Sequence, residues 1–353
     1  MVERKLGRDR EVDEVVRLKR AAQVGRLLLG ELNGAMEEIS PERFSALPRS
    51  ELQRQLVSCR RGLRGEIEKF CKKNFENLGP EGLASLYVPL REHGSSLRMP
   101  LVQFIAHYGQ PRPGVLGGAP IHSTVHLSPW GLQTEYPELR LTQDLAEAYN
   151  VAAETHAELE TMTSMSWDKA KSEIERNKIG RLLRRRAFHQ RMALIACFNL
   201  VEAYINGLAW AYVHHVGAAA LSETQRGLLM EDKRPVNTID KLVKIPRIIG
   251  HRDEGPLHQS REPLKSFLEI VKPFRDAVVH ASPFDAPEKF GGYNKLTKLY
   301  EMDQKAVDIA VSTTLAMIAA IHAFLDGNGK LPSWIPDRDA SGRFQVDALK
   351  RPP

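Results

Sequence analysis

Apolar residues recur along most of the chain at the three- and four-residue spacing of amphipathic helices. The most regular run lies at 51–75, and its apolar positions are Leu52, Leu56, Cys59, Leu63, Ile67 and Phe70. Charged residues such as Arg54 and Glu68 occupy the opposite face. Residues 11–38 carry a similar stripe. The pattern predicts two N-terminal helices that can pack as an antiparallel pair.

The pattern changes between residues 76 and 138, where glycine and proline recur and no helical period persists. Short alternating runs at 123–127 and 132–139 are typical of strands and can form a small hairpin. We therefore expect an irregular, loop-rich middle. A helix resumes near Thr142, and its apolar side carries Leu145, Tyr149, Ala152, Leu159 and Met162.

The second half of the chain is strongly helical in pattern. The predicted helices are 169–216, 262–281 and 301–325. In the first of them a basic stretch leads into an apolar part, from Phe188 to Val213. A linker rich in proline and charge, 231–256, separates the first two helices, and Pro283 ends the second. Three such helices are enough for a bundle around one shared core.

Length and composition suggest two domains in an all-α protein. We predict a helical N-terminal region of unassigned role at 1–165, which contains the irregular segment 76–138. A helical bundle at 168–330 and a C-terminal tail at 331–353 follow. Hydrophobic residues make up 42% of the chain and charged residues 27%, which indicates a folded globule. The net charge of +6 and the pI near 9.1 suit a nucleic-acid partner without requiring one.

The same sequence favours a cytoplasmic protein. Its N-terminus is charged and lacks the apolar core of a secretory signal. The three cysteines, Cys59, Cys71 and Cys197, form neither a disulfide framework nor a CxxC pair. Segment 309–325 is nearly apolar, but it falls short of spanning length and contains polar residues such as His322. We expect a buried core helix there and no membrane partner.

One group of residues has the chemistry of a catalytic site. Arg275, Asp276 and His280 lie near the end of the helix predicted at 262–281. RNA can be cleaved without a metal if a base removes the proton of the 2′-hydroxyl and a fixed cation stabilises the charge that develops on phosphate. Histidine is the natural base near neutral pH, and arginine offers a planar fork to phosphate oxygens. On a regular helix, positions 275 and 280 lie about 140° apart, so they reach one phosphate only if the helix end distorts or a second copy contributes.

This group resembles the motif of HEPN ribonucleases, in which an arginine and a polar residue precede a histidine at the end of a bundle helix. Residues 196–206, ACFNLVEAYIN, are similar to the long helix of HEPN domains, and residues 240–246, DKLVKIP, are similar to their inter-helix segment. The resemblance covers about residues 180–328. It implies a metal-independent endoribonuclease without cofactors that works as a homodimer through the C-terminal bundle. Its products would carry 2′,3′-cyclic phosphate and 5′-hydroxyl ends, and its role would lie in toxin or antiviral defence systems, with a regulatory protein as a further partner.

A different class of function also fits these residues. An Arg–Asp pair at a helix end is commonly a solvated salt bridge, and a terminal histidine interacts favourably with the helix dipole. The alternative is therefore a catalytically inactive, HEPN-like helical scaffold that binds a protein or nucleotide partner. The enzyme requires Arg275 and His280 to face one open cleft, whereas a scaffold can bury or separate them.

Several further residues are weaker candidates. Glu202 falls on the apolar stripe of its helix, so it is either an orienting partner for Arg275 or a partly exposed flank of the helix. The candidate RNA-binding residues are Arg181, Arg184, Arg185, Lys241 and Lys244, which lie in basic segments that can equally be solvated helix faces. His122 and His126 have a four-residue spacing, but their surroundings do not predict a helix, and we expect no metal site.

Overall fold

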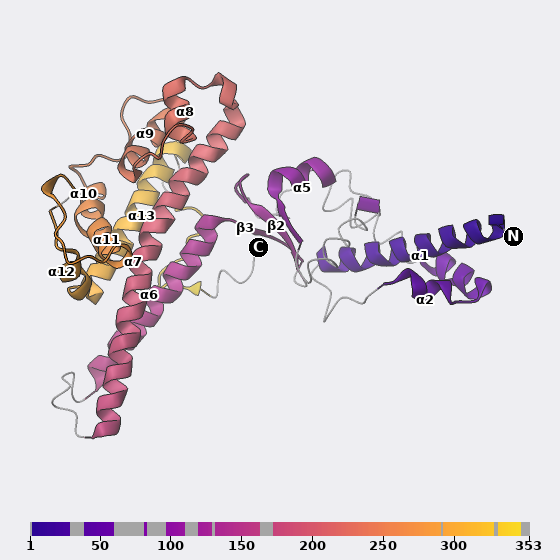
Figure 1. Cartoon of the computed structure of the whole chain (residues 1–353), viewed down its shortest axis with the longest axis horizontal. Coiled ribbons are helices and arrows are strands. Elements are labelled where there is room, and N and C mark those ends of the chain that lie inside the picture. The colour runs from indigo at the N-terminus through magenta and orange to yellow at the C-terminus, as the bar shows by residue number, and fades with distance from the viewer. Residues whose placement is uncertain are drawn as a thin grey trace. The chain divides into compact units, whose positions relative to one another are not determined.

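The computed structural model is mostly helical, with one small three-stranded sheet, as Figure 1 shows. It describes residues 2–28, 39–59, 81–82, 97–109, 119–128, 131–162, 172–290, 292–327 and 331–346. The chain forms two compact units, Met1–Tyr136 and Pro137–Pro352. The predicted predominance of helix is thus confirmed.

The first unit contains the two helices predicted at its start. Helix α1 (Val2–Leu28) begins well before residue 11, and residues 49–59 form the described part of the second helix. The short α2 (Pro41–Ser45) lies between them in sequence and packs against α1. Their shared core consists of Val12, Val15, Val16, Ile39, Phe44, Leu52 and Leu56. Residues 29–38 and 60–75 of the predicted helices lie outside the described residues.

The sheet of the first unit contains the predicted hairpin. Strands β2 (Thr124–Ser128) and β3 (Gly131–Glu135) pair antiparallel, with Thr124 opposite Glu135. The sequence pattern missed β1 (Leu97–Pro100), which pairs with the other edge of β2 and leads directly into α5 (Leu101–Tyr108). The predicted second strand was too long, because Pro137 starts a helix, a position that suits the fixed φ of proline.

Three long helices build the second unit. Helix α6 (Pro137–Thr161) packs along α7 (Glu173–Val216), and α13 (Gln304–Asp326) packs against both. Leu145 and Tyr149 of α6 belong to the same buried core as Cys197 and Ile318. The boundary between the units therefore precedes α6, whereas the sequence pattern placed this helix in the N-terminal region. The apolar side of α6 packs against α7 and α13, and Phe344 near the C-terminus adds a contact with Tyr149.

Helix α7 is a single helix of 44 residues that joins the basic stretch to the apolar part. The Ser172 side chain caps its start by accepting a hydrogen bond from the backbone N–H of Glu175 at 3.1 Å. Gly217 ends it at a φ of 85°, a conformation that favours glycine. In Figure 1, α7 runs the length of the second unit, with α8 (Glu223–Leu229) and α9 (Thr238–Gly250) near its C-terminal end.

Segment 231–256 was predicted as a linker, and this prediction was wrong for its centre. Asn237 caps α9 by accepting a hydrogen bond from the backbone N–H of Asp240 at 2.8 Å. The helix then buries Leu242 and Ile245 in the common core. Pro246 lies inside it, so burial of this apolar face outweighs the lost hydrogen bond of the proline.

The helix predicted at 262–281 is present in three parts. These are α10 (Leu264–Ser266), the π-helical turn η3 (Phe267–Val271) and α11 (Lys272–Val279). Pro273 lies at the start of α11. Because proline has no N–H to donate to a carbonyl of the preceding turn, the wider π-helical turn of η3 accommodates it. A loop with a short 3-10 turn (Glu288–Phe290) leads to α12 (Lys295–Tyr300) and then to α13.

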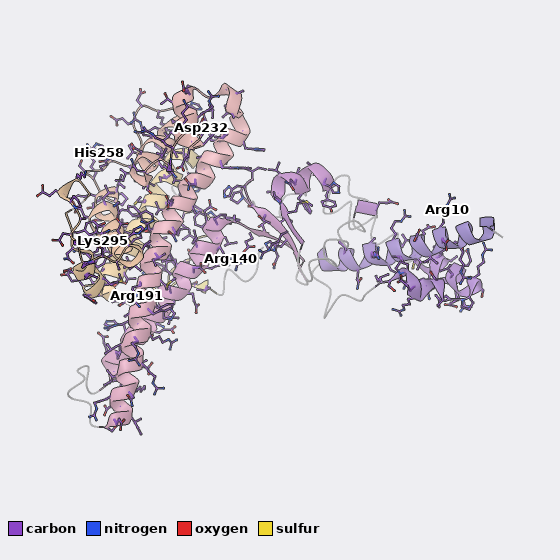
Figure 2. The ribbon with its side chains drawn as sticks, viewed as in Figure 1. Arg10, Arg140, Arg191, Asp232, His258 and Lys295 are labelled. Atoms are coloured by element: carbon purple, nitrogen blue, oxygen red, sulfur yellow. The ribbon has the colours of Figure 1, made fainter. Side chains whose placement is uncertain are left out.

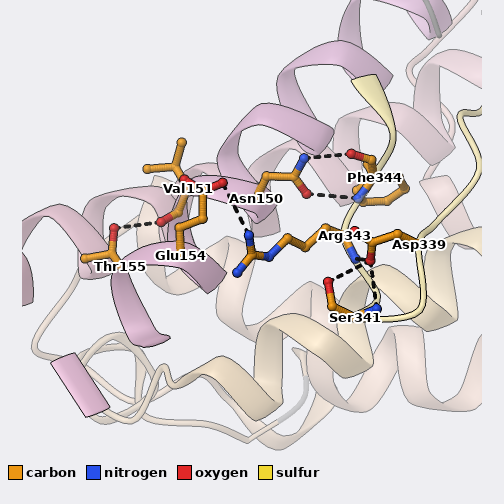
Figure 3. A network of polar contacts seen from close by, with 8 residues as sticks. All are labelled: Asn150, Val151, Glu154, Thr155, Asp339, Ser341, Arg343 and Phe344. Atoms are coloured by element: carbon orange, nitrogen blue, oxygen red, sulfur yellow. Dashed lines mark hydrogen bonds and ion pairs between the residues drawn. The ribbon is translucent and has the colours of Figure 1, made fainter. Parts of the chain in front are cut away.

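The C-terminal segment 331–346 binds to α6 rather than forming a free tail. The Asn150 side chain donates to the carbonyl of Phe344 at 2.8 Å and accepts from its backbone N–H at 2.9 Å (Figure 3). Arg343 pairs with Glu154 at 3.6 Å, and Asp339 closes the turn by accepting from Ser341. The predicted tail at 347–353 lies outside the described residues.

Helices α7 and α13 are long and apolar enough, by length and composition, to cross a membrane. About 61% of the apolar window of α7 and 44% of that of α13 are buried inside the unit. Packing against each other and against α6 and α9 accounts for their composition. Such helices are weak evidence for a membrane protein, because core helices of water-soluble bundles have the same character.

Candidate active site at the end of helix α11

The carboxylate of Asp276 is the centre of the candidate site. It accepts hydrogen bonds from Lys272 Nζ at 2.8 Å, from Arg275 Nη1 at 2.8 Å and from Tyr293 Oη at 2.6 Å. Lys272 and Asp276 are four residues apart, so they share one face of α11, and the loop after the helix brings Tyr293 to them. Asp276 is buried, as a carboxylate with three donors can be.

These contacts set the ionisation of both acidic groups. Burial alone would raise the pKa of Asp276, but hydrogen bonds from Lys272, Tyr293 and Arg275 outweigh it and hold the pKa below its ordinary value. Burial and the hydrogen bond to Asp276 raise the pKa of Tyr293. Asp276 is therefore an anion and Tyr293 a neutral donor at neutral pH, which makes Asp276 a positioning group rather than a proton carrier.

Arg275 is held on two sides. One side is its ion pair with Asp276, and the other is the ring of Phe198 on α7, whose centroid lies 4.2 Å from the guanidinium carbon. Phe198 in turn stacks on Phe267 of the π-helical turn, with ring centroids 5.6 Å apart. The guanidinium is thus oriented by contacts with two elements, α11 and α7, while only one of its five N–H groups is bonded to Asp276.

His280 lies where α11 ends. Its backbone N–H still donates to the carbonyl of Asp276 at 2.9 Å, but its φ of −126° and ψ of 49° are not helical. Its side chain is exposed. The helix end therefore departs from the regular geometry that would place positions 275 and 280 on different faces. Arg275 and His280 line one pocket within a single copy of the chain.

This pocket has a volume of about 350 Å³ and lies between α7, α11 and the start of α9. Its wall combines apolar and polar groups: Phe198, Phe267 and Ile239 are apolar, whereas Asn237, Thr238 and Lys272 carry polar atoms. We call it the α11 pocket. Arginine, lysine, histidine and hydroxyl groups around one concave surface suit a phosphate-containing ligand.

Glu202 is not the partner of Arg275 that the sequence suggested as one option. Its Oε1 accepts a hydrogen bond from Thr238 Oγ1 at 3.2 Å, while Arg275 pairs with Asp276. The carboxylate that pairs with Arg275 belongs to Asp276, its neighbour in sequence, and not to a residue of α7. Glu202 instead anchors Thr238, a residue of the α11 pocket, to α7.

The candidate RNA-binding residues do not line the α11 pocket. Lys241 is only 5% exposed and pairs with Glu231 and Asn206, so its ammonium group is not available to RNA. Lys244 is paired with Asp240 at 2.5 Å on α9. Arg181, Arg184 and Arg185 are exposed on the N-terminal part of α7, roughly 20 Å along the helix from Phe198.

His122 and His126, the two histidines considered as metal ligands, do not line the α11 pocket. His126 lies on β2, where its Nε2 is 2.5 Å from a carboxylate oxygen of Glu135 on β3, and His122 precedes the strand. Among the described residues no group of three or more histidine, cysteine, aspartate or glutamate side chains is placed to hold a metal ion.

Two residues of the site were missed by sequence reasoning. Lys272 lies four residues before Asp276, a spacing that is typical of ion pairs on a helix and could have indicated this contact. Tyr293 carried no signal, because only the fold of the loop after α11 brings it to Asp276. Phe198 lies in the helical segment that resembles HEPN domains. The sequence did not predict its contact with Arg275, because this contact depends on the packing of α11 on α7.

Comparisons with known proteins give no family assignment. No protein-family model matches the chain, and no curated protein or solved structure shows significant similarity to it.

Proposed function

We propose that this protein is a metal-independent endoribonuclease of the HEPN type. The observation that carries the proposal is that Arg275 and His280 line one open pocket, with Arg275 oriented by Asp276 and Phe198. A base and a fixed cation on one concave surface are the groups that metal-independent RNA cleavage requires. The spacing of these residues and the helices around them resemble HEPN domains, and the proposed role in toxin or antiviral defence rests on that resemblance.

In the proposed reaction, neutral His280 removes the proton of a ribose 2′-hydroxyl. The 2′ oxygen attacks the adjacent phosphorus, the bond to the 5′ oxygen breaks, and the leaving oxygen takes a proton from an imidazolium. Arg275 stabilises the negative charge on the phosphate oxygens during this step. Asp276 holds Arg275 in place. The products carry a 2′,3′-cyclic phosphate and a 5′-hydroxyl.

The enzyme is proposed to act as a homodimer through a stripe of α7. The stripe, which we call the α7 stripe, consists of Phe188, Met192, Ile195, Asn199, Ala203, Asn206 and Trp210. These residues follow the helical period and remain partly or fully exposed, including the large apolar side chains of Phe188, Met192 and Trp210. Glu202, which anchors the pocket residue Thr238, lies on the flank of this stripe, about 40° from Phe188.

A dimer formed there would bring two α11 pockets close to one interface. The second copy's His280 would then be available to protonate the leaving oxygen. One copy lacks this second imidazole, since His280 is the only histidine that lines the α11 pocket among the described residues.

The deciding experiment is an RNA cleavage assay in the presence of EDTA. We expect the purified protein to cut mixed RNA at a rate that chelation leaves unchanged. The 3′ ends of the products should resist ligation until the cyclic phosphate is opened and the resulting monophosphate is removed, and a polynucleotide kinase should phosphorylate the 5′ ends with ATP. Loss of cleavage in EDTA would contradict this mechanism.

A catalytically inactive scaffold is the second candidate, and one observation favours it. Lys272, Arg275 and Tyr293 all bind Asp276, an arrangement that also serves to fasten α11 to the following loop. If the native dimer cuts no RNA under any of these conditions, the scaffold takes the place of the enzyme. The partner would then be a protein or a nucleotide bound at the α11 pocket.

A further inference from the structure

A second pocket lies on the other side of the Lys272–Asp276 pair. Its volume is about 360 Å³, and its wall includes Lys272, Asp276, Phe284, Tyr293 and Lys295. Lys272 and Asp276 also line the α11 pocket, so the two pockets share this ion pair as a common wall. We call it the loop pocket, because the segment between α11 and α12 forms most of it.

The loop that forms this pocket is fastened at its base. The Asn294 side chain donates from Nδ2 to Asp285 Oδ1 at 2.7 Å, and the backbone N–H of Ala286 donates to the carbonyl of Tyr293 at 3.0 Å. Tyr293 ties the same loop to Asp276 on α11. These contacts join residues 285–286 to residues 293–294 and connect this part of the loop to α11.

The rim of the loop pocket carries an aromatic ring with little protein contact. Phe284 is 79% exposed, and its backbone N–H donates to Ser282 Oγ at 3.2 Å, which fixes the direction of the chain there. An exposed ring beside a pocket offers a face on which another aromatic group can stack. Nucleic-acid bases stack on such rings whatever their sequence.

The loop pocket is lined by two lysines and two aspartates, and one of the lysines has no carboxylate partner among the described residues. Lys295 is partly buried and has no salt-bridge partner among the described residues. Figure 2 labels it. The two carboxylates in the wall are already bonded, Asp276 by its three donors and Asp285 by Asn294. Lys295 is therefore the cation available to a phosphate.

We propose that the loop pocket binds the nucleotide next to the cleaved phosphate in a single-stranded RNA. The base stacks on Phe284, its phosphate lies toward Lys295, and the chain crosses the Lys272–Asp276 wall into the α11 pocket. Only an unpaired base can present its face to Phe284, so the site selects single strands over duplex. This inference rests on the proposed ribonuclease function and names its substrate class.

Binding is tested apart from cleavage by using the full chain with His280→Ala and a short, fluorescently labelled single-stranded RNA. In this background Phe284→Ala should weaken binding about tenfold, equivalent to about 1.4 kcal/mol, when measured by fluorescence anisotropy at fixed salt. Phe284→Trp should restore the affinity, because the stacking surface is regained. Tyr300→Ala is the matched control, because Tyr300 is an equally exposed ring, at 80%, outside the pocket wall.

The outcomes separate this inference from the function on which it rests. If the native protein cuts RNA but Phe284→Ala binds as tightly as Tyr300→Ala, the loop pocket is not a subsite and the ribonuclease proposal stands. If Phe284→Ala and not Tyr300→Ala loses affinity while the native protein cuts nothing, the pocket binds RNA and the ribonuclease proposal fails. Equal loss on a duplex of the same length, or no binding of single-stranded RNA by any form, would overturn the inference.

Discussion

Asp276 accepts hydrogen bonds from three side chains, two of which are cations. The same carboxylate orients Arg275 and fastens Tyr293 of the following loop, so it belongs to the walls of both pockets. At the residue scale, site geometry and local stability therefore depend on one group. The effect of a substitution on the stability of the fold can therefore be separated from its effect on cleavage only by comparing buried site residues with exposed ones.

Asp276→Asn should lower the free energy of unfolding by about 1.5–3 kcal/mol, because hydrogen bonds to a charged acceptor are lost and two cations remain beside a neutral amide. Chemical denaturation at pH 7 measures this change. Glu301→Gln is the control, since Glu301 forms an exposed pair with Lys298 at 3.5 Å and this substitution should change stability by less than about 0.5 kcal/mol.

The same variant should change the pH dependence of stability. The folded-state pKa of Asp276 lies below its ordinary value of 3.8, so its contribution is complete above about pH 4 and is lost as pH falls through the folded-state pKa. The difference in unfolding free energy between the native protein and Asp276→Asn should therefore shrink below pH 4. A difference that stays constant from pH 7 to pH 2 would contradict the ionised, hydrogen-bonded carboxylate.

His280→Ala should abolish RNA cleavage and leave the fold intact. The His280 side chain is exposed beyond the end of α11, so its loss should change the free energy of unfolding by no more than about 0.5 kcal/mol. Arg275→Ala should also abolish cleavage, but it should cost stability as well, because the guanidinium packs on Phe198 and pairs with Asp276. Cleavage rates and denaturation curves of the two variants check this contrast.

His215→Ala is the matched control for His280→Ala. His215 is an exposed histidine in the last turn of α7 and lines neither pocket. This variant should cut RNA at the native rate. Native-rate cleavage by His280→Ala itself would remove His280 from the mechanism.

At the scale of elements, contacts distant in sequence hold the second unit together. The C-terminal segment is joined to α6 by the two hydrogen bonds between Asn150 and Phe344. Tyr149 adds an edge-on contact with the Phe344 ring, and Arg338 donates to Tyr149 Oη at 2.9 Å. The segment covers part of α6 that would otherwise face solvent, so α6 is stable only in the context of the whole unit.

Asn150→Ala should release this segment. Two hydrogen bonds to backbone are lost, which should cost about 1–3 kcal/mol, and trypsin should then cut faster after Arg338 and Arg343. Limited proteolysis followed by mass spectrometry locates the cuts. Asn177→Ala serves as the control, because Asn177 is exposed in the first turns of α7. Equal protection of the segment in both variants would show that other contacts suffice.

At the scale of the whole molecule, the proposed dimer depends on a surface of the helical bundle that one copy leaves exposed. The α7 stripe leaves the apolar side chains of Phe188, Met192 and Trp210 exposed, and its flank borders the wall of the α11 pocket. Other parts of the helix pack against α6, α13, α9 and α11. Association through the stripe would bury side chains that are otherwise exposed to water.

Ala203→Arg should convert the dimer to a monomer without unfolding it. Ala203 is small and partly exposed in the middle of the stripe, so a long charged side chain would separate the two helices and leave an unpaired charge between them. Sedimentation velocity at micromolar concentration measures the change, and RNA cleavage should fall with the dimer. Ala219→Arg, at an exposed alanine after α7, should remain dimeric. A native protein that sediments as a monomer and still cuts RNA would contradict the dimer.

The sequence alone determined most of the helices and the residues of the motif. Strong periodicity located α7 and α13, and alternation located the β2–β3 hairpin, because these signals are local and repeat within one element. It also identified Arg275, Asp276 and His280, since they lie within six residues of one another. Helix α9 was missed because proline and charge obscured its short apolar face.

Only the tertiary structure decided which groups meet. The non-helical backbone at His280 brings it to the pocket of Arg275, and the packing of α11 on α7 places Phe198 beneath the guanidinium. Tyr293 reaches Asp276 through a loop, whereas Glu202 bonds to Thr238 and Lys241 is buried. Periodicity tells which face of a helix is apolar, but the partner of a polar side chain depends on how separate elements pack, and that information is not local in sequence.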